Sequence, residues 1–277
     1  MGQVQNYFSL QDEVAIITGG GGLLGEKHAE AILDMDGSVV LVDINEKSLN
    51  EIYNRLGEKY EKSKMLALVV DITDEEQIEA AKNSIVERFG KVDILINNAA
   101  NNPTMDMNEG KNYSRFENFR REDWIKDIEV GLTGAFLCSK IFGSLMAERK
   151  KGVILNISSD LGIIGPDQRL YKNNNLNEDE QQVKPVTYSV VKTGLIGLTR
   201  YLATYWADKN IRTNAVAFGG VFNNQDSEFL DKVKKRIPMG RLSNKDEYKA
   251  SIIYLCSKAS SYMNGATVVI DGGRTIW

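Results

Sequence analysis

Residues 16–25 read IITGGGGLLG, an apolar segment that runs into four consecutive glycines. The apolar residues before the glycines predict a buried strand, and the pattern after them predicts a helix. Within this turn Gly20, Gly22 and Gly25 have the Gly-x-Gly-x-x-Gly spacing of dinucleotide-binding sites. The first glycine would allow a tight turn, the second would let a pyrophosphate approach the backbone, and the third would let helix and strand pack closely. The unpaired N–H groups at the start of the helix would attract the phosphates.

Apolar segments and helical patterns alternate along the rest of the chain. The apolar segments contain no regular polar positions, so they predict strands of a parallel sheet that is covered on both faces. Thr73, followed by Glu76, predicts a capping box at the start of one intervening helix. No repeat, linker or change in composition divides the chain. We therefore expect one α/β domain over residues 1–277, a doubly wound (Rossmann) fold with helices on both faces of a mostly parallel, seven-stranded sheet. Its strands are expected at residues 14–17, 38–42, 65–70, 92–96, 152–157, 213–217 and 268–271.

Two long polar segments interrupt this alternation, near residues 101–121 and 160–185. Loops longer than about 15 residues inside a compact domain are usually functional. Both segments follow the carboxyl ends of predicted strands, the edge where open α/β sheets bind ligands. We expect them to form walls of a substrate site.

Composition excludes several classes of partner. Charged residues make up 26% of the chain and the net charge is −4, which argues against a nucleic-acid-binding protein. No uninterrupted apolar run approaches the roughly 18 residues that span a bilayer, and the N-terminus shows no signal-peptide pattern. His28, the single histidine, has no cysteine or histidine cluster around it, so we expect no metal site. Cys138 and Cys256 lie in apolar helical patterns and are expected to be buried thiols. These features favour a cytoplasmic protein that binds neither a membrane nor nucleic acid.

Asp43 follows the second predicted strand and indicates which dinucleotide would bind. A carboxylate at this place would accept hydrogen bonds from the adenosine ribose hydroxyls of NAD. The 2′-phosphate of NADP would meet that negative charge, and the glycine turn contains no Arg or Lys to neutralise it. We therefore expect NAD rather than NADP. Each aspartate would also suit a role in capping the turn that follows it, but for Asp43 the pairing with the glycine turn favours the ribose contact. Asp71, after the third strand, would lie beside the adenine, and for it the capping role is nearly as good an interpretation.

Tyr188 and Lys192 are four residues apart and share one face of a predicted helix. The preceding strand ends in Ser158 and Ser159, which would place a serine hydroxyl opposite the tyrosine. A phenol has an ordinary pKa near 10, and a nearby ammonium would lower that pKa toward the range in which acid–base catalysis is efficient. The serine would donate a hydrogen bond to a substrate oxygen as hydride reaches the adjoining carbon.

With these pieces the chain resembles the single-domain short-chain dehydrogenase/reductase family over essentially its full length. The resemblance implies that Tyr188 is the general acid/base, that Ser159 orients the carbonyl, and that Lys192 holds the nicotinamide ribose and tunes the tyrosine. Ser159 is chosen over Ser158 because the family serine precedes x-x-Gly, here Asp160-Leu161-Gly162. The motifs that carry the resemblance are the glycine turn, Asp43, Asp71, Asn97-Asn98-Ala99, Ser159, Tyr188-x-x-x-Lys192, Arg212-Thr213-Asn214-Ala215-Val216 and Asp271-Gly272-Gly273.

The resemblance also implies the cofactor contacts and self-association as a homodimer or homotetramer. Val221 would meet the nicotinamide carboxamide through its backbone. Gly194 and Gly197, on the helix of Tyr188, would allow helices of two subunits to pack closely, or would pack against the sheet. The expected cofactor-binding residues are Thr18, Gly19, Gly20, Gly22, Leu23, Leu24, Gly25, Asp43, Ile44, Asp71, Ile72, Asn98, Ala99, Ala100, Tyr188, Lys192, Gly219 and Val221, with Asn97 also lining the site.

The chain departs from the family pattern at several positions. Leu23 fills the place of a glycine in many single-domain members, and Thr18-Gly19-x-x-Gly22-x-x-Gly25 instead has the spacing of longer members. Gly131 stands where the family has an asparagine that supports a water relay to the lysine, which leaves the proton route open. Asn223 replaces an expected threonine. The segment between Ser159 and Tyr188 is about twice its usual length in the family.

The polar second insert favours a substrate rich in hydroxyl groups, such as a sugar or sugar phosphate, with Asp160, Gln168 and Arg169 as candidate contacts. Arg169, Lys172 and Lys184 would suit a phosphate or carboxylate, although a solvated loop without a substrate role fits equally well. A narrower resemblance, to oxidoreductases associated with flagellin modification and legionaminic-acid-type sugar biosynthesis, implies a role in bacterial surface-sugar production. Its motifs are Ser158-Ser159-Asp160-Leu161, Pro166-Asp167-Gln168-Arg169-Leu170-Tyr171, Tyr201-Leu202-Ala203-Thr204-Tyr205-Trp206 and Gly272-Gly273-Arg274-x-x-Trp277. A reductase of oxoacyl or simple ketone substrates and a non-catalytic NAD-binding protein remain as alternatives.

Overall fold

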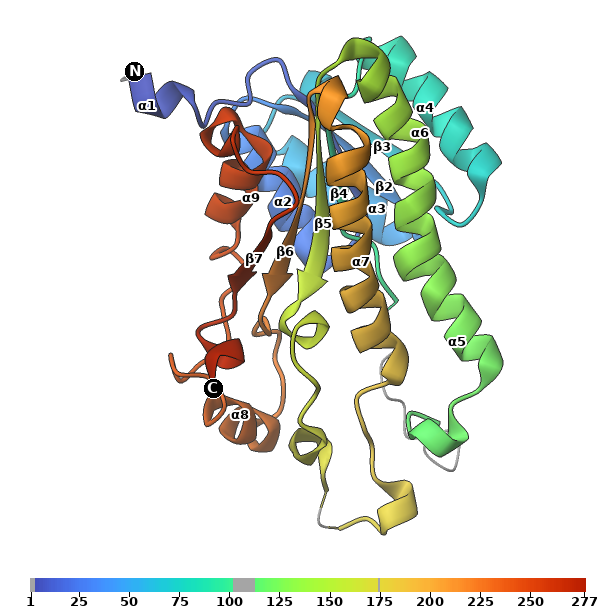
Figure 1. The fold of residues 1–277 in the computed structure, drawn as a ribbon, viewed down its shortest axis with the longest axis vertical. Coiled ribbons are helices and arrows are strands. Elements are labelled where there is room, and N and C mark those ends of the chain that lie inside the picture. Colours follow the sequence, from blue (N-terminus) through green and yellow to red (C-terminus); the bar gives the residue numbers. More distant parts are fainter. Residues whose placement is uncertain (1–2, 102–112, 174) are drawn as a thin grey trace.

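A computed structural model describes residues 3–101, 113–173 and 175–277. Its centre is a parallel seven-stranded sheet in the order β3-β2-β1-β4-β5-β6-β7 (Figure 1). The order reverses between β1 and β4, which are paired in parallel, so the carboxyl ends of these two strands flank a ligand-binding crevice. The predicted fold is confirmed. The strands are β1 Val14–Thr18, β2 Ser38–Asp43, β3 Met65–Val69, β4 Ile94–Asn97, β5 Gly152–Ser159, β6 Ile211–Phe218 and β7 Thr267–Ile270.

Helices cover both faces of this sheet. Consecutive strand residues point to opposite faces, and both faces are buried, so Ile16 and Ile17 lie in separate hydrophobic cores. One core is completed by α2 Leu23–Asp34, α3 Glu46–Gly57 and α9 Lys249–Cys256, and the other by α4 Glu75–Phe89, α6 Gly134–Arg149 and α7 Val186–Tyr205. This double burial explains the apolar strands without alternation. Cys138 and Cys256 are buried thiols, as predicted.

Three further helices lie outside these layers. Helix α5, Arg121–Ile128, continues through a π-helical turn, Glu129–Thr133, into α6. By length and composition the whole of Arg121–Arg149 would be able to cross a membrane, which the sequence reading did not expect, but 56% of its most apolar window is buried in this fold. The apolar residues of this helix are those of a core helix. Helix α1, Gln3–Asn6, precedes the sheet, and α8, Ser227–Lys234, lies beyond its carboxyl edge (Figure 1).

Some local expectations are wrong. Asp74, not Thr73, caps α4: its carboxylate accepts from the N–H groups of Glu76 and Gln77, whereas the Thr73 hydroxyl donates to Asp71 Oδ1. Helix α8 was not predicted. The pattern of residues 244–258 predicts one helix, but α9 covers only Lys249–Cys256.

The second insert is an ordered arm beyond the carboxyl ends of the strands (yellow-green to yellow in Figure 1). It contains short 3₁₀ turns at Asp160–Gly162, Gln168–Tyr171 and Glu178–Glu180. In the first insert, residues 102–112 lie outside the described residues, as does Asn174 of the second. The rest of the two inserts touch: Val183 N donates to Ser114 Oγ over 3.1 Å, and Arg115 Nη1 donates to the carbonyl of Glu178 over 2.6 Å.

Candidate active site

The glycine turn joins β1 to α2 with a geometry that needs glycine. Gly19, not Gly20, has the positive φ of the tight turn, 65°, so the role assigned to Gly20 was wrong. Gly20 instead packs on Leu41, whose Cβ would lie 2.9 Å from an added Cβ. A Cβ on Gly25 would lie 2.2 Å from the Gly19 carbonyl oxygen, so α2 approaches the turn as closely as backbone allows. The Thr18-Gly19-x-x-Gly22-x-x-Gly25 spacing therefore describes the turn better.

The turn is tied to the end of β4 across the switch point. Thr18 Oγ1 accepts from the N–H groups of Asn98 and Ala99, at 3.0 and 3.1 Å. The Asn98 amide donates to the carbonyls of Thr18 and Gly19, at 2.9 and 3.2 Å. Asn97 points into the core, where its amide donates to Asn156 Oδ1 at 2.8 Å. Asn97 and the Asn98 side chain thus hold the crevice together, and Ala99 and Ala100 follow at its edge.

The crevice fits the diphosphate of a dinucleotide. Gly22 caps α2 without a side chain, so among the described residues no side chain caps the first-turn N–H groups of this helix. These donors, with the partial positive charge of the helix N-terminus, suit a phosphate. Leu23 and Ile44 are exposed beside the turn, and Ile72 is buried against Gly134.

Asp43 and Asp71 both make the turn-capping contacts that were weighed as alternatives. Asp43 Oδ2 accepts from Gly21 N, and Asp43 Oδ1 accepts from Asn45 N, both at 2.9 Å. Asp71 Oδ1 accepts from the N–H and the hydroxyl of Thr73, at 2.9 and 2.7 Å. The first contact also fixes the Asp43 carboxylate directly against the glycine turn, where an adenosine ribose would reach it.

The loop after β6 closes the crevice from the other side. Tyr248 donates its hydroxyl hydrogen to the carbonyl of Gly219 at 2.9 Å, and a Cβ on Gly219 would lie 2.8 Å from Asp271 Cα. Gln225 donates to the carbonyl of Val221 at 2.9 Å. Gly219 and Val221 are therefore held by side chains that the sequence reading did not single out.

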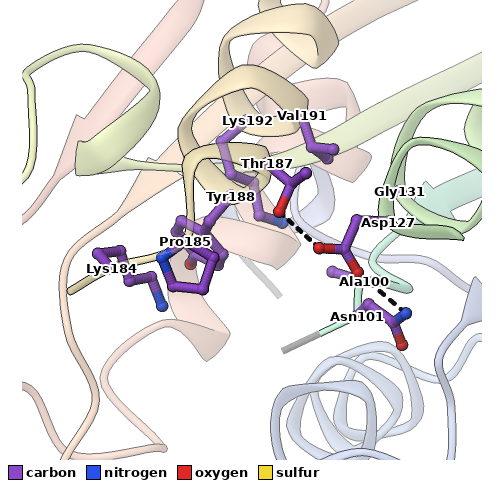
Figure 2. A pocket seen from close by; sticks show the side chains of 10 residues that line it. All are labelled: Ala100, Asn101, Asp127, Gly131, Lys184, Pro185, Thr187, Tyr188, Val191 and Lys192. Carbon is purple, nitrogen blue, oxygen red and sulfur yellow. Dashed lines mark hydrogen bonds between the residues drawn. The ribbon is translucent and has the colours of Figure 1, made fainter. Parts of the chain in front are cut away.

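Tyr188 and Lys192 occupy the first turns of α7 and line one pocket (Figure 2). Lys192 is 5% exposed, and its Nζ donates to the carbonyl of Ile157 at 2.8 Å. The Lys192 Nζ lies 5.9 Å from the centroid of the Tyr188 ring. Burial, helped by the positive charge of Lys184, lowers the pKa of Lys192 to about 8.

The phenol of Tyr188 does not have the lowered pKa that the sequence suggested for it. Burial raises the pKa of Tyr188, a hydrogen bond with Ser159 acts to lower it, and the charge of Asp160 raises it. Lys192 has little effect on Tyr188 because its ammonium is turned to the Ile157 carbonyl. Desolvation is the dominant influence on the pKa of this tyrosine.

Ser159 ends β5 and is held by its neighbours. Its Oγ donates to Asp160 Oδ1 at 2.6 Å and accepts from Leu161 N at 3.2 Å. Asp160 Oδ2 lies 3.1 Å from Arg274 Nη1, and the two side chains are 4% and 9% exposed. Asp160 is therefore buried behind the serine, a place that suits positioning of Ser159 rather than contact with substrate.

The pocket contains polar groups that the sequence reading missed. Its lining includes Asp127, whose Oδ2 accepts from the hydroxyl of Thr187 and whose Oδ1 accepts from the amide of Asn101 at 3.1 Å (Figure 2). Asp127 precedes Gly131 by one helical turn, but nothing in the sequence pairs it with Thr187. The pocket is lined by Ala100, Asn101, Asp127, Gly131, Lys184, Pro185, Thr187, Tyr188, Val191 and Lys192.

Val191 explains why Gly131 departs from the family pattern. A Cβ on Gly131 would lie 2.5 Å from Val191 Cγ1, so Val191 fills the space that a side chain at residue 131 would need. An asparagine there would require the valine to move.

The candidate substrate residues of the second insert do not line this pocket. Gln168 instead binds the backbone of Lys184: its Oε1 accepts from Lys184 N at 2.8 Å and its amide donates to the Lys184 carbonyl at 3.5 Å. Arg169 is 81% exposed and pairs with Asp167 at 2.8 Å. Lys184 does line the pocket, with its Nζ 3.8 Å from the centroid of the Tyr188 ring. Burial lowers the pKa of Lys184 to about 8.

The described residues contain no group of three or more His, Cys, Asp or Glu side chains placed to hold a metal ion. The chemistry available at the site is that of a serine hydroxyl, a phenol and two ammonium groups beside a dinucleotide-shaped crevice.

Known proteins resemble this chain in sequence and in fold. The family described as short chain dehydrogenase matches residues 13–171, and that described as enoyl-(acyl carrier protein) reductase matches residues 177–275. The chain is 28% identical to D-threitol dehydrogenase of Mycolicibacterium smegmatis over 97% of this chain and 95% of the relative. It is 27% identical to post-translational flagellin modification protein A of Campylobacter coli, over 95% and 98%. A 3-oxoacyl-[acyl-carrier-protein] reductase of Thermotoga maritima is 29% identical over 96% and 99%. A gluconate 5-dehydrogenase of Burkholderia cenocepacia, solved in complex with NADP and tartrate, is 27% identical with a TM-score of 0.83 over 98% of both chains.

Proposed function

Because the chain belongs to the short-chain dehydrogenase/reductase family, whose members are NAD(P)-dependent oxidoreductases, we propose that it interconverts a hydroxyl and a ketone on a polar, sugar-like substrate with NAD. The observation that carries this proposal is that Tyr188 and Lys192 line one pocket and that Ser159 lies within hydrogen-bonding reach of Tyr188. These three side chains come from the end of β5 and the start of α7, next to the switch point of the sheet.

Each residue of the site would have a separate role in oxidation of the substrate hydroxyl. The glycine turn and the N-terminus of α2 would hold the diphosphate, and the bound nicotinamide would supply the hydride acceptor. Tyr188 takes the proton of the substrate hydroxyl, and Ser159 fixes that oxygen by a hydrogen bond. Lys192 would hold the nicotinamide ribose and stabilise the phenolate once cofactor and substrate redirect its ammonium from the Ile157 carbonyl.

Replacing Tyr188 by Phe tests the proposal. We expect Tyr188→Phe to lower kcat for polyol oxidation by about 10³-fold or more, because the ring stays in place while the exchangeable proton is lost. The measurement is formation of reduced nicotinamide by absorbance, with nucleotide binding as a check of folding. Turnover that survives the substitution would refute the mechanism, and absence of turnover in both proteins would favour the non-catalytic NAD-binding alternative.

NAD is proposed over NADP because Asp43 is fixed against the glycine turn by Gly21. Asp43→Ala should weaken NADH binding about 10-fold and narrow the difference between NADH and NADPH, because a charged hydrogen-bond acceptor contributes about 1.5–3 kcal/mol. Asp43→Asn is the matched variant, since its amide oxygen can still accept from Gly21. The measurement is the dissociation constant of each nucleotide by fluorescence titration. If the ratio of the NADPH constant to the NADH constant is the same in both variants as in the wild type, the proposed preference for NAD is contradicted.

A polyol or sugar substrate is supported by the likeness to D-threitol dehydrogenase and by the polar pocket. The likeness to a 3-oxoacyl-[acyl-carrier-protein] reductase supports a second candidate, reduction of an oxoacyl thioester. Strong activity on an oxoacyl thioester with none on polyols or sugar phosphates would select that candidate. The likeness to a flagellin modification protein supports a place in bacterial surface-sugar production.

We also propose that the protein is cytoplasmic and forms a homodimer or homotetramer. Gly197 is open to the surface of α7, with no atom within 4 Å of an added Cβ, whereas Gly194 packs on Leu132 of the same chain. Tyr201 and Tyr205 are stacked and 62% and 60% exposed on α7. This apolar helix surface, open at Gly197, supports contact with a second copy.

A further inference from the structure

We propose that Lys184 binds an acidic group of the substrate, a carboxylate or a phosphate, so that the preferred substrates are acidic sugar derivatives rather than neutral polyols. This inference rests on the proposed function and specifies the substrate class of the same site. Residue 184 belongs to the second insert, residues 160–185.

The insert holds Lys184 at the reacting group. The Lys184 Nζ lies 3.8 Å from the centroid of the Tyr188 ring, within the range of a cation–π contact. Gln168 binds both the N–H and the carbonyl of residue 184, and the buried Pro185 follows it. In Figure 2 the Lys184 side chain lies on the opposite side of Tyr188 from Asp127. A lysine whose backbone is held at both polar groups is a positioned charge rather than part of a freely moving surface loop.

The charge balance of the pocket favours an anion. Of its charged lining residues, Lys184 and Lys192 are cationic, and Asp127 is the anionic one. Both carboxylate oxygens of Asp127 already accept hydrogen bonds, from Thr187 and Asn101. The two ammonium groups act on each other, since the charge of Lys184 contributes to the lowered pKa of Lys192. The carboxylate of Asp160 also acts on Lys184, but it is paired with Arg274 and accepts a hydrogen bond from Ser159.

The other two cations of the insert are placed differently. Arg169 is 81% exposed and pairs with Asp167. Lys172 is exposed, and its carbonyl accepts from Lys232 on α8. Neither residue lines the pocket, so the structure selects Lys184 from the three cations that the sequence offered. Because Lys184 sits over the Tyr188 ring, the acidic group would lie only a few bonds from the carbon that reacts.

Two matched pairs of probes test the proposal: D-gluconate with D-glucitol, and glycerol 3-phosphate with glycerol. We expect the wild-type protein to favour the acidic member of at least one pair in kcat/KM, and the better pair distinguishes carboxylate from phosphate. Lys184→Met should lower kcat/KM for that acidic member at least 10-fold more than for its neutral partner, mainly through KM. Lys184→Arg should recover most of the loss, and the control Lys172→Met should resemble wild type.

Binding of the acidic probes by calorimetry supplies a readout that does not need turnover. Gluconate or glycerol 3-phosphate should bind the wild type and bind Lys184→Met at least 10-fold more weakly. Gln168→Ala, which keeps the charge but releases its backbone, should give an intermediate loss. Equal losses for acidic and neutral probes in Lys184→Met would overturn the proposal in favour of a role in positioning Tyr188, and so would failure of the wild type to bind either anion. A third outcome is that the wild type binds the anion, that Lys184→Met loses this binding, and that neither protein transfers hydride. That outcome would leave this inference standing and refute the proposed function.

Discussion

Ser159 has one hydroxyl hydrogen, and the structure directs it to the carboxylate of Asp160 at 2.6 Å. Arg274 holds the other Asp160 oxygen at 3.1 Å, so the carboxylate cannot turn away. A carboxylate only accepts hydrogen bonds, which fixes the direction of this one. To donate a hydrogen bond to a substrate oxygen, the serine hydroxyl has to turn away from Asp160. The carboxylate therefore opposes the hydrogen bond through which Ser159 would fix the reacting oxygen.

Asp160→Asn would release the serine hydrogen. A neutral amide competes for that hydrogen less strongly than the carboxylate does, so the hydroxyl would turn more readily to the substrate oxygen. We expect KM for a polyol and KM for its ketose both to fall, each about 3- to 10-fold, the effect of one hydrogen bond. Initial rates in both directions, with the polyol and ketose chosen from the substrate screen, provide the measurement.

The control for this experiment is Asp208→Asn, which removes an exposed carboxylate remote from the pocket and should leave both constants unchanged. If Asp160→Asn raises both Michaelis constants, Asp160 stabilises the site rather than holding back the serine hydrogen.

At the residue scale, sequence reasoning found the groups that a short motif encodes. Tyr188 and Lys192 are four residues apart on one helix, so their meeting in the pocket follows from helical geometry. Asp160 and Asp127 were misjudged or missed because their partners, Arg274 and Thr187, are far away in the sequence. The tight-turn role was assigned to Gly20 rather than Gly19 because two glycine spacings overlap in one run, and only the backbone angles separate them.

The second insert contributes Lys184 to the pocket, and contacts with distant parts of the chain hold it in place. Leu170, 3% exposed, enters a small hydrophobic cluster with Val233 of α8 and with Ile237 and Leu242. Asp167 also pairs with Arg236. The first part of the insert, around Leu170, therefore packs against α8. Its last part, residues 178–183, forms hydrogen bonds with Ser114 and Arg115. The sequence predicted a polar wall here but neither its 3₁₀ turns nor α8, because these short elements depend on each other's contacts.

Leu170→Ala should release the insert without unfolding the sheet. The cluster around Leu170 is separate from the two main cores, so we expect only a small shift of the global thermal midpoint. Local opening should expose the chain near Arg169 and Lys172 and raise the rate of tryptic cleavage there several-fold. Limited proteolysis read by mass spectrometry measures it.

Ile163→Ala is the matched control, because Ile163 belongs to the same insert but is 44% exposed. Cleavage of this control should match the wild type. A large drop in the thermal midpoint of Leu170→Ala with no gain in cleavage would show that the insert unfolds together with the sheet.

Across the whole molecule, polar side chains at the carboxyl ends of the strands differ in role from those at the amino ends. The carboxyl edge carries the glycine turn and the pocket, and polar side chains there remain available to ligands. At the opposite edge Asp93 is 1% exposed and joins several elements: Val14 N donates to it at 3.0 Å, Lys91 lies 3.1 Å away, and Arg149 donates at 3.1 Å. Sequence periodicity located both edges by predicting the strands, but it contains nothing about this buried carboxylate.

Asp93→Asn should destabilise the fold in a pH-dependent way. Burial alone raises the pKa of Asp93, but the hydrogen bond from Val14 N and the charges of Lys91 and Lys151 outweigh it, so the pKa in the folded state lies below its usual value. A carboxyl with a depressed folded pKa contributes stability above its unfolded pKa of about 3.9, and this contribution is lost as the pH falls through the folded value. We expect Asp93→Asn to lower the free energy of unfolding by about 2 kcal/mol at pH 7, since the cations around Asp93 are partly exposed and rehydrate. Urea titrations at pH 7, 5.5, 4.5 and 3.5 should show the difference from wild type constant down to about pH 5 and smaller below it. The surface variant Asp208→Asn should match the wild type throughout, and a difference for Asp93→Asn that stays the same at pH 3.5 would show that packing rather than charge holds this edge together.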